Sequence, residues 1–80
     1  MDINDLAKKL SEMYENAGKG NKVTMIHLFG IRYAEKIKMG GFTAGEIIRN
    51  TKLKNGNPMS DAYQTEIQKG IKLSKYVVEK

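Results

Sequence analysis

The sequence predicts an all-α fold with four to five helices. Apolar residues recur at helical spacing near the N-terminus, a longer apolar stretch without proline follows, and a helix-capping motif opens the next segment. No stretch sustains the apolar–polar alternation of a half-buried strand. A chain of 80 residues buries only about 60 percent of its unfolded surface, too little to divide between two cores. We therefore expect one domain over residues 1–80.

The first predicted helix begins after Asp2 or Asn4, because either side chain can accept a hydrogen bond from the free amides of a first helical turn. The apolar residues that follow have the i, i+3, i+4, i+7 spacing of one buried face: Ile3, Leu6, Ala7, Leu10, Met13, Tyr14 and Ala17. Gly18 and Gly20 then supply the permissive backbone angles that end a helix and turn the chain.

A second helix is predicted from Lys22 to Met39, where "KVTMIHLFGIRYAEKIKM" contains no proline and is stopped by two glycines. Its first half has the β-propensity of a strand, but helical apolar spacing continues through "RYAEKI". Apolar residues lie around most of the cylinder, so this helix should be central. Gly30 costs about 1 kcal/mol relative to Ala inside a helix, which indicates close approach of another helix.

The third predicted helix is short, from Ala44 to Thr51. Thr43 and Glu46 fit the capping box, in which each side chain bonds the backbone amide of the other at the start of a helix. Residues 50–57 contain too many turn-forming residues to continue the helix.

A fourth helix follows the turn. Pro58 fits its first turn with Asn57 as the cap, and Ser60 is a competing cap. The apolar stripe of this helix consists of Tyr63, Ile67, Gly70 or Ile71, Ser74 and Val77. Gly70 is expected to kink the helix, or to divide it into a reading helix to about residue 69 and a closing helix from about residue 72.

The net charge favours an acidic partner and the residue types exclude several other functions. The chain carries +5, and residues 49–80 hold seven cations against three anions, which favours nucleic acid.

Without cysteine, and with His27 as the single histidine, we predict no metal site. The carboxylates are scattered and "GKGNK" lacks the spacing of a phosphate-binding loop, so we predict no catalytic residues, no cofactor and no enzymatic activity. The N-terminus has no long apolar run, which indicates a cytoplasmic protein outside the membrane.

A short capped helix, a turn and a longer helix are the parts of a helix-turn-helix, whose second helix places its outward side chains in the major groove. The outward positions of the second helix are the predicted base contacts: Ser60, Asp61, Gln64, Thr65 and Gln68. Gln can pair with adenine, and Ser and Thr can serve donor or acceptor edges. Asp61 can accept from cytosine, or can instead stabilise the dipole at the helix start.

Hydroxyl and cationic side chains near the same two helices are the predicted phosphate contacts: Thr43, Arg49, Lys52, Lys54, Lys69 and Lys72. Polar residues of these types also occur on any solvated helix face. The conjunction of a capped short helix, a turn, an apolar i, i+4 pair and local positive charge is what favours DNA.

The segments "GEIIRNTKL" and "SDAYQTEIQKGIKLSKYV" resemble bacterial helix-turn-helix DNA-binding domains. With "KVTMIHLFGIRYAEKI", most of the chain resembles small bacterial proteins described as HTH-like. The resemblance implies a three-helix core preceded by an N-terminal helix. It also implies sequence-specific DNA binding through Ser60, Gln64, Thr65 and Gln68. The turn "KLKNGNP" is longer than the usual three or four residues, so the resemblance does not fix how the two helices cross.

The expected function is sequence-specific binding of double-stranded DNA, as a transcriptional regulator or an accessory protein of a bacterial system. A homodimer is a candidate assembly, because one such unit reads few base pairs, and the first helix could supply the contact. The alternative is a helical protein-protein interaction module that keeps the fold without binding DNA and uses an apolar groove between the first two helices.

Overall fold

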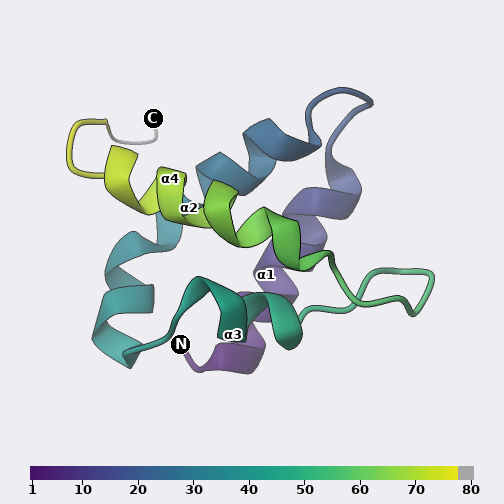
Figure 1. Cartoon of the computed structure of the whole chain (residues 1–80), viewed down its shortest axis with the longest axis horizontal. Coiled ribbons are helices and arrows are strands. Elements are labelled where there is room, and N and C mark those ends of the chain that lie inside the picture. The colour runs from purple at the N-terminus through teal and green to yellow at the C-terminus, as the bar shows by residue number, and fades with distance from the viewer. Residues whose placement is uncertain (78–80) are drawn as a thin grey trace.

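In the computed structural model, which describes residues 1–77, the chain folds into four α-helices and one short 3-10 helix (Figure 1). They are α1 (Ile3–Asn16), α2 (Lys22–Gly40), α3 (Ala44–Arg49), the 3-10 helix η1 (Asp61–Tyr63) and α4 (Gln64–Leu73). No strand forms within these residues, where one isolated antiparallel bridge joins Lys52 to Pro58. The predicted all-α fold is confirmed.

α1 is capped by Asp2, one of the two predicted caps. The Asp2 carboxylate accepts a hydrogen bond from the Asp5 amide at 2.9 Å, and the Asp5 carboxylate accepts one from the Asp2 amide at 3.3 Å. Both carboxylates lie at the positive end of the helix dipole, which they stabilise. The predicted apolar face is buried, with Leu6 and Leu10 fully covered.

α2 is the central helix and ends one residue beyond the predicted range. Gly41 adopts a φ of 69° there, and its amide donates to the carbonyl groups of Ile37 and Lys38, a conformation that glycine adopts without steric cost. α2 packs against both α1 and α4, and Figure 1 shows α4 lying across it. Phe29 of α2 is fully buried in the shared core.

The backbones of α2 and α4 touch where two glycines meet. A Cβ atom built on Gly30 would lie 2.6 Å from the Ile67 carbonyl oxygen and 2.9 Å from the Gly70 Cα atom. Any larger residue at either position would therefore separate the helices. The prediction that Gly30 marks the close approach of another helix is confirmed.

Gly70 lies inside α4 and does not divide it, so the expected break is wrong. The missing side chain serves the contact with α2, and the helix continues to Leu73. Hydrogen-bonded turns follow, in which the Val77 amide donates to the Leu73 carbonyl at 3.0 Å. The closing helix expected from about residue 72 is absent up to residue 77, and its remaining positions, 78–80, lie outside the described residues.

α3 begins at the predicted capping box and ends at Arg49 rather than at Thr51. The Glu46 amide donates to the Thr43 hydroxyl oxygen at 3.1 Å, and the Glu46 carboxylate accepts from the Thr43 amide at 3.0 Å. Thr51 lies just beyond the helix, where it is buried and its hydroxyl donates to the Ile47 carbonyl at 2.7 Å. The Ile47 carbonyl also accepts from the Asn50 amide at 3.2 Å, so both bonds close the last turn of α3.

Residues 51–59 form a small antiparallel hairpin between α3 and α4, which Figure 1 shows projecting from the body of the molecule. The Leu53 amide donates to the Asn57 carbonyl at 3.0 Å, and the Gly56 amide donates to the Leu53 carbonyl at 2.9 Å. Gly56 has a φ of 84°, as expected for a three-residue hairpin loop that closes through a left-handed residue. The long turn read from the sequence is an ordered hairpin.

Ser60, and not Asn57, caps the segment that leads into α4. The Ser60 hydroxyl oxygen accepts from the Ala62 amide at 3.3 Å, at the start of η1. The expectation that Pro58 lies in the first helical turn is wrong, because Pro58 pairs with Lys52 in the hairpin. A proline fits this extended position, since an edge strand does not need its missing amide.

The core draws on all four α-helices and on the hairpin. Its buried apolar residues are Leu6, Leu10, Met13, Ile26, Phe29, Ile37, Ala44, Ile47, Ile48, Met59 and Ile67. Met59 anchors the end of the hairpin in this cluster, so α3, the hairpin and α4 are held as one unit.

We expect Gly70→Ala to lower the free energy of unfolding by about 1 to 3 kcal/mol, the usual cost of overpacking a core. Helix propensity alone predicts the opposite, a gain of about 1 kcal/mol. Urea denaturation distinguishes the two results. Gly18→Ala is the control, because a Cβ atom there would meet Asn21 at an ordinary 3.5 Å. A Gly70→Ala protein as stable as the wild type would contradict the close backbone contact.

Candidate nucleic-acid interface

α3, the hairpin and α4 form a helix pair with an extended connection. The two helices pack against each other through fully buried side chains, Ile47 and Ile48 from α3 and Ile67 from α4. Tyr63, the other predicted inward residue, is half-buried against the same core. Because Ile67 and Gly70 face inward, the opposite side of α4 faces solvent.

The exposed side of α4 carries most of the predicted base contacts. Thr65, Gln68 and Lys72 are exposed and follow one another at spacings of three and four residues, which places them on one side of the helix. Ser60 and Asp61 are exposed in the segment just before it. The structure therefore groups these five residues beside one another along α4 and its entry.

Gln64 differs from the other predicted base contacts because it is half-buried against α3. A Cβ atom on Gly45 would lie 3.0 Å from Gln64 Oε1 and 3.2 Å from Arg49 Nη1. The absence of a side chain at Gly45 thus gives room to both of these polar groups. Gly45 was not among the predicted site residues. The sequence feature that could have identified it is its position in the first turn of a capped helix.

Thr43 stands at the N-terminus of α3, where a phosphate contact is predicted. Its hydroxyl oxygen and amide are both bonded to Glu46, whose carboxylate lies at this helix end. That negative charge already stabilises the helix dipole and would repel a phosphate. The phosphate contact of Thr43 stays a prediction, and the hydrogen bonds of the capping box oppose it.

The predicted phosphate-binding lysines of the hairpin occupy different places. Lys52 lies beside α1, where its carbonyl accepts a hydrogen bond from the Ser11 hydroxyl at 2.9 Å and its side chain lines a groove with residues of α1. Lys54 is exposed in the three-residue loop at the hairpin tip. Only Lys54 stands clear of the helices.

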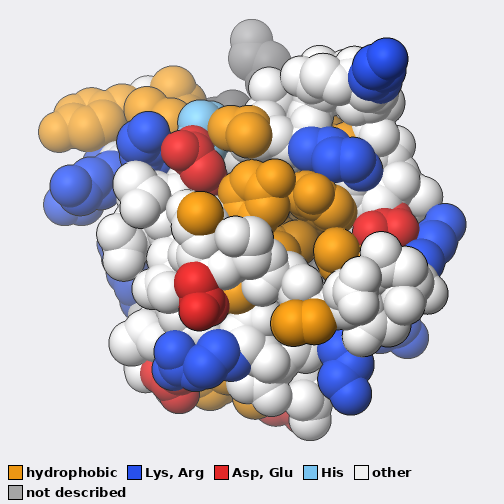
Figure 2. Space-filling view, turned by 45° about the vertical axis from the view of Figure 1, so that its right-hand side comes forward, with side chains coloured by type: hydrophobic (Ala, Val, Ile, Leu, Met, Phe, Trp, Pro, Cys, Tyr) orange, Lys and Arg blue, Asp and Glu red, His pale blue; other side chains and the backbone are white. Residues whose placement is uncertain are grey.

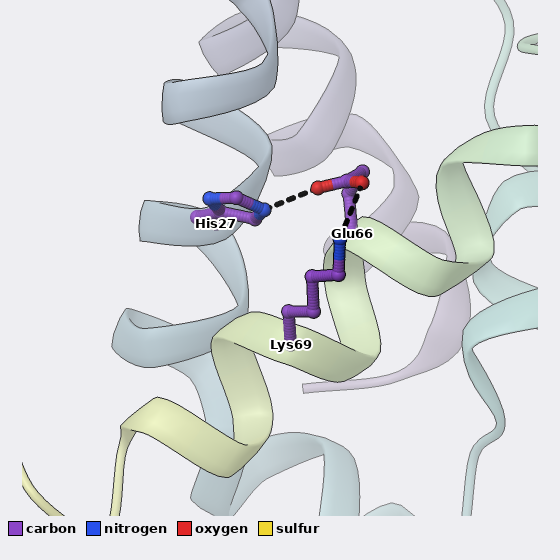
Figure 3. Close-up of polar contacts among 3 residues, drawn as sticks. All are labelled: His27, Glu66 and Lys69. Carbon is purple, nitrogen blue, oxygen red and sulfur yellow. Dashed lines mark hydrogen bonds and ion pairs between the residues drawn. The ribbon is translucent and has the colours of Figure 1, made fainter.

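Three polar side chains, His27, Glu66 and Lys69, link α2 to α4 (Figure 3). The Glu66 carboxylate bonds the imidazole of His27 through one oxygen, and its other oxygen accepts from the Lys69 ammonium at 3.2 Å. These contacts, the histidine first and the lysine second, lower the pKa of Glu66 below its usual value. The pairing also opposes the predicted role of Lys69, because a phosphate would compete with Glu66 for the ammonium.

The pair formed by Glu66 and Lys69 could be read from their spacing of three residues in one helix. The third member could not, because His27 is 39 residues away in the sequence. Only the crossing of α2 and α4 brings the imidazole to the carboxylate.

Tyr63 sits at the entry to α4 and contacts α1. Its ring meets that of Tyr14 edge-on, with centroids 5.6 Å apart, and the two hydroxyl oxygens are 3.4 Å apart. The hydrogen bond with Tyr14, followed by burial, raises the pKa of Tyr63. This contact fixes the start of α4 against α1.

Cationic side chains are spread over the face that Figure 2 presents. Hydrophobic side chains gather near its centre, and Lys and Arg side chains are distributed around the edge without forming one continuous patch. The described contacts agree, since Lys52 lies beside α1 and Lys69 is paired with Glu66 within α4. The predicted phosphate contacts therefore occupy more than one side of the helix pair.

Comparison with known proteins gives one match. A family model described as "HTH-like domain" matches residues 2–80 of the chain. Comparison with curated proteins and with solved structures gives no match. In the part of the chain that the structure describes, no helix is long and apolar enough to cross a membrane.

The contacts of Glu66 with His27 and Lys69, which lower its pKa, predict that part of the free energy of unfolding is lost at acid pH. A carboxyl group whose pKa is lowered by folding stabilises the native state above its unfolded value of about 4.3 and loses this effect as the pH falls through the native value. Wild-type protein should therefore be more stable than Glu66→Gln near pH 6, and the difference should shrink toward about pH 3. Urea denaturation across this range measures it.

Glu35→Gln is the matched control, since Glu35 is an exposed carboxylate of α2. Its stability difference from the wild type, measured over the same pH range, is the baseline for that of Glu66→Gln. An equal pH dependence for both variants would show that the contacts of Glu66 do not favour its ionised form.

Proposed function

The chain belongs to the HTH-like domain family, and from this membership we propose that it binds double-stranded DNA sequence-specifically, as a transcriptional regulator or an accessory protein of a bacterial system. α4 is the reading helix of this proposal. A homodimer is part of it, because one unit offers a short reading surface and two units would read a longer site.

The observation that carries the proposal is the exposed side of α4. Thr65 and Gln68 are exposed, in contrast to the buried Ile67, and their side chains make no hydrogen bond or ion pair within residues 1–77. Side chains of these types can bond base edges in the major groove, and a good two-pronged pair contributes about 1 to 3 kcal/mol of discrimination. The rigid attachment of α4 to α2 through two glycines limits the entropy lost on binding.

Backbone contacts in this proposal come from exposed cations around the reading helix. Arg49 lies next to Gln64 over Gly45, Lys72 continues the exposed side of α4, and Lys54 stands at the hairpin tip. Each phosphate that they neutralise releases counterions and makes binding weaker at higher salt.

A protein-interaction module is the second candidate, and Figure 2 supplies the observation in its favour. Hydrophobic side chains occupy the centre of the face shown, and cations are scattered around them without forming one patch. A surface with an apolar centre and a polar rim resembles a protein interface, whereas a DNA-binding surface has its cations clustered on one face. Exposed Leu73 and Tyr76 add apolar area at the C-terminal end of α4.

Salt dependence separates these two functions. With three to six phosphates contacted, affinity for a random-sequence duplex should fall about 40-fold to about 2,000-fold between 50 and 200 mM salt. Fluorescence anisotropy of a labelled duplex measures the change. Absence of binding even at 50 mM salt would remove the DNA proposal and leave the interaction module.

Replacement of Thr65 and Gln68 by Ala should reduce sequence preference while sparing non-specific affinity, because base contacts specify the site and phosphate contacts supply most of the general affinity. The target is first selected from a random duplex pool, and affinities for it and for a scrambled duplex are then compared. Lys72→Ala is the control and should weaken both affinities alike. If the double variant loses affinity equally for the selected and the scrambled duplex, Thr65 and Gln68 do not contact bases.

A further inference from the structure

The hairpin of residues 51–59 is more ordered than a connection between two helices requires. Thr51 at its start is buried and bonded to Ile47, and Met59 at its end is buried in the core. The Met59 amide donates to the Thr51 carbonyl at 3.4 Å, and the Ser11 hydroxyl of α1 holds the Lys52 carbonyl. Both ends of the hairpin are thus anchored to the body of the molecule, and the tip projects from this base.

The tip is polar and well supplied with hydrogen-bond donors. Lys54, Asn55, Gly56 and Asn57 are all exposed. The Asn55 side-chain oxygen accepts from the Asn57 amide at 2.9 Å, which leaves the Asn55 NH₂ group as a donor. The tip therefore offers one ammonium and two carboxamide groups to a partner.

The hairpin and its flanking residues carry only positive charges of their own. The 14 residues between Glu46 and Asp61 contain three cations, Arg49, Lys52 and Lys54, and no carboxylate. A segment without any acid of its own attracts an anionic surface and gives its cations no neighbouring carboxylate in sequence to pair with.

The hairpin lies next to the entry of the reading helix. Its second arm, residues 57–59, is followed by Ser60 and η1, which lead into α4. Figure 1 shows the hairpin projecting beyond the N-terminal end of α4. The major groove is only about 12 Å wide, so a segment that projects beside the start of a helix in this groove is close to the sugar-phosphate backbone that borders it.

We propose that the tip of this hairpin, Lys54 to Asn57, is a second DNA-binding element that clamps the phosphate backbone beside the reading helix. The inference rests on the proposed function and adds to it a site outside the helix pair. Lys54 neutralises one phosphate, and the carboxamides of Asn55 and Asn57 donate to phosphate oxygens. The hairpin fixes the position of α4 along the groove and reads no bases.

The test compares the salt dependence of duplex binding among single variants of the full chain. One phosphate contact contributes about 0.9 to the slope of log affinity against log salt, a factor of about 3.5 between 50 and 200 mM. In Lys54→Ala the fold-weakening over this range should be about 3.5 times smaller than in the wild type. Asn57→Ala should weaken binding and leave the slope unchanged, because a neutral donor displaces no counterion.

Lys19→Ala is the matched control, since Lys19 is an exposed lysine in the loop between α1 and α2 and its removal changes the net charge equally. Its salt slope should equal that of the wild type. Thermal denaturation of each variant checks that the fold is retained, as expected for exposed positions.

The outcomes separate the two proposals. If the wild type binds with a steep salt slope and Lys54→Ala behaves like Lys19→Ala, the hairpin proposal is overturned and DNA binding stands. If the wild type does not bind duplex DNA at 50 mM salt, both are overturned.

Discussion

The direct contact between the backbones of α2 and α4, at Gly30 and Gly70, is the constraint on which the rest of the structure depends. Two helices can approach this closely only where both lack a side chain. The contact fixes which side of α4 is buried, since Ile67 lies one turn before Gly70 on the same side. It consequently also fixes which side carries Thr65 and Gln68 to solvent.

The remaining contacts of α4 follow from this crossing. The imidazole of His27 meets Glu66 because both lie beside the glycine contact, and the carboxylate in turn holds Lys69. Tyr63 reaches Tyr14 of α1 at the other end. These polar and aromatic contacts orient a helix that the glycines have already positioned, and they leave its outer side unobstructed.

The hairpin between α3 and α4 separates this chain from a helix pair with a short turn. Its two ends are anchored through Thr51 and Met59, so the extra residues project outward and do not loosen the packing of α3 on α4. A longer connection therefore coexists with a fixed arrangement of the two helices. The cations, by contrast, are spread over several sides, and this spread is the feature in which the surface departs most from a simple DNA-binding face.

The sequence by itself determined the helices and their ends wherever the signal is local. The cap at Asp2, given as one of two candidates, the capping box at Thr43 and the glycine stop after α2 act within a few residues, and so do the apolar spacings, which is why they could be recognised without a partner. Only the tertiary structure decided the role of Gly70, because a glycine that breaks a helix and one that admits a neighbour look alike in sequence. The same holds for Pro58, which pairs across the hairpin, and for the side chain of Gln64, which lies against α3. Their partners lie on other elements or are chosen by packing, and no local pattern encodes that choice.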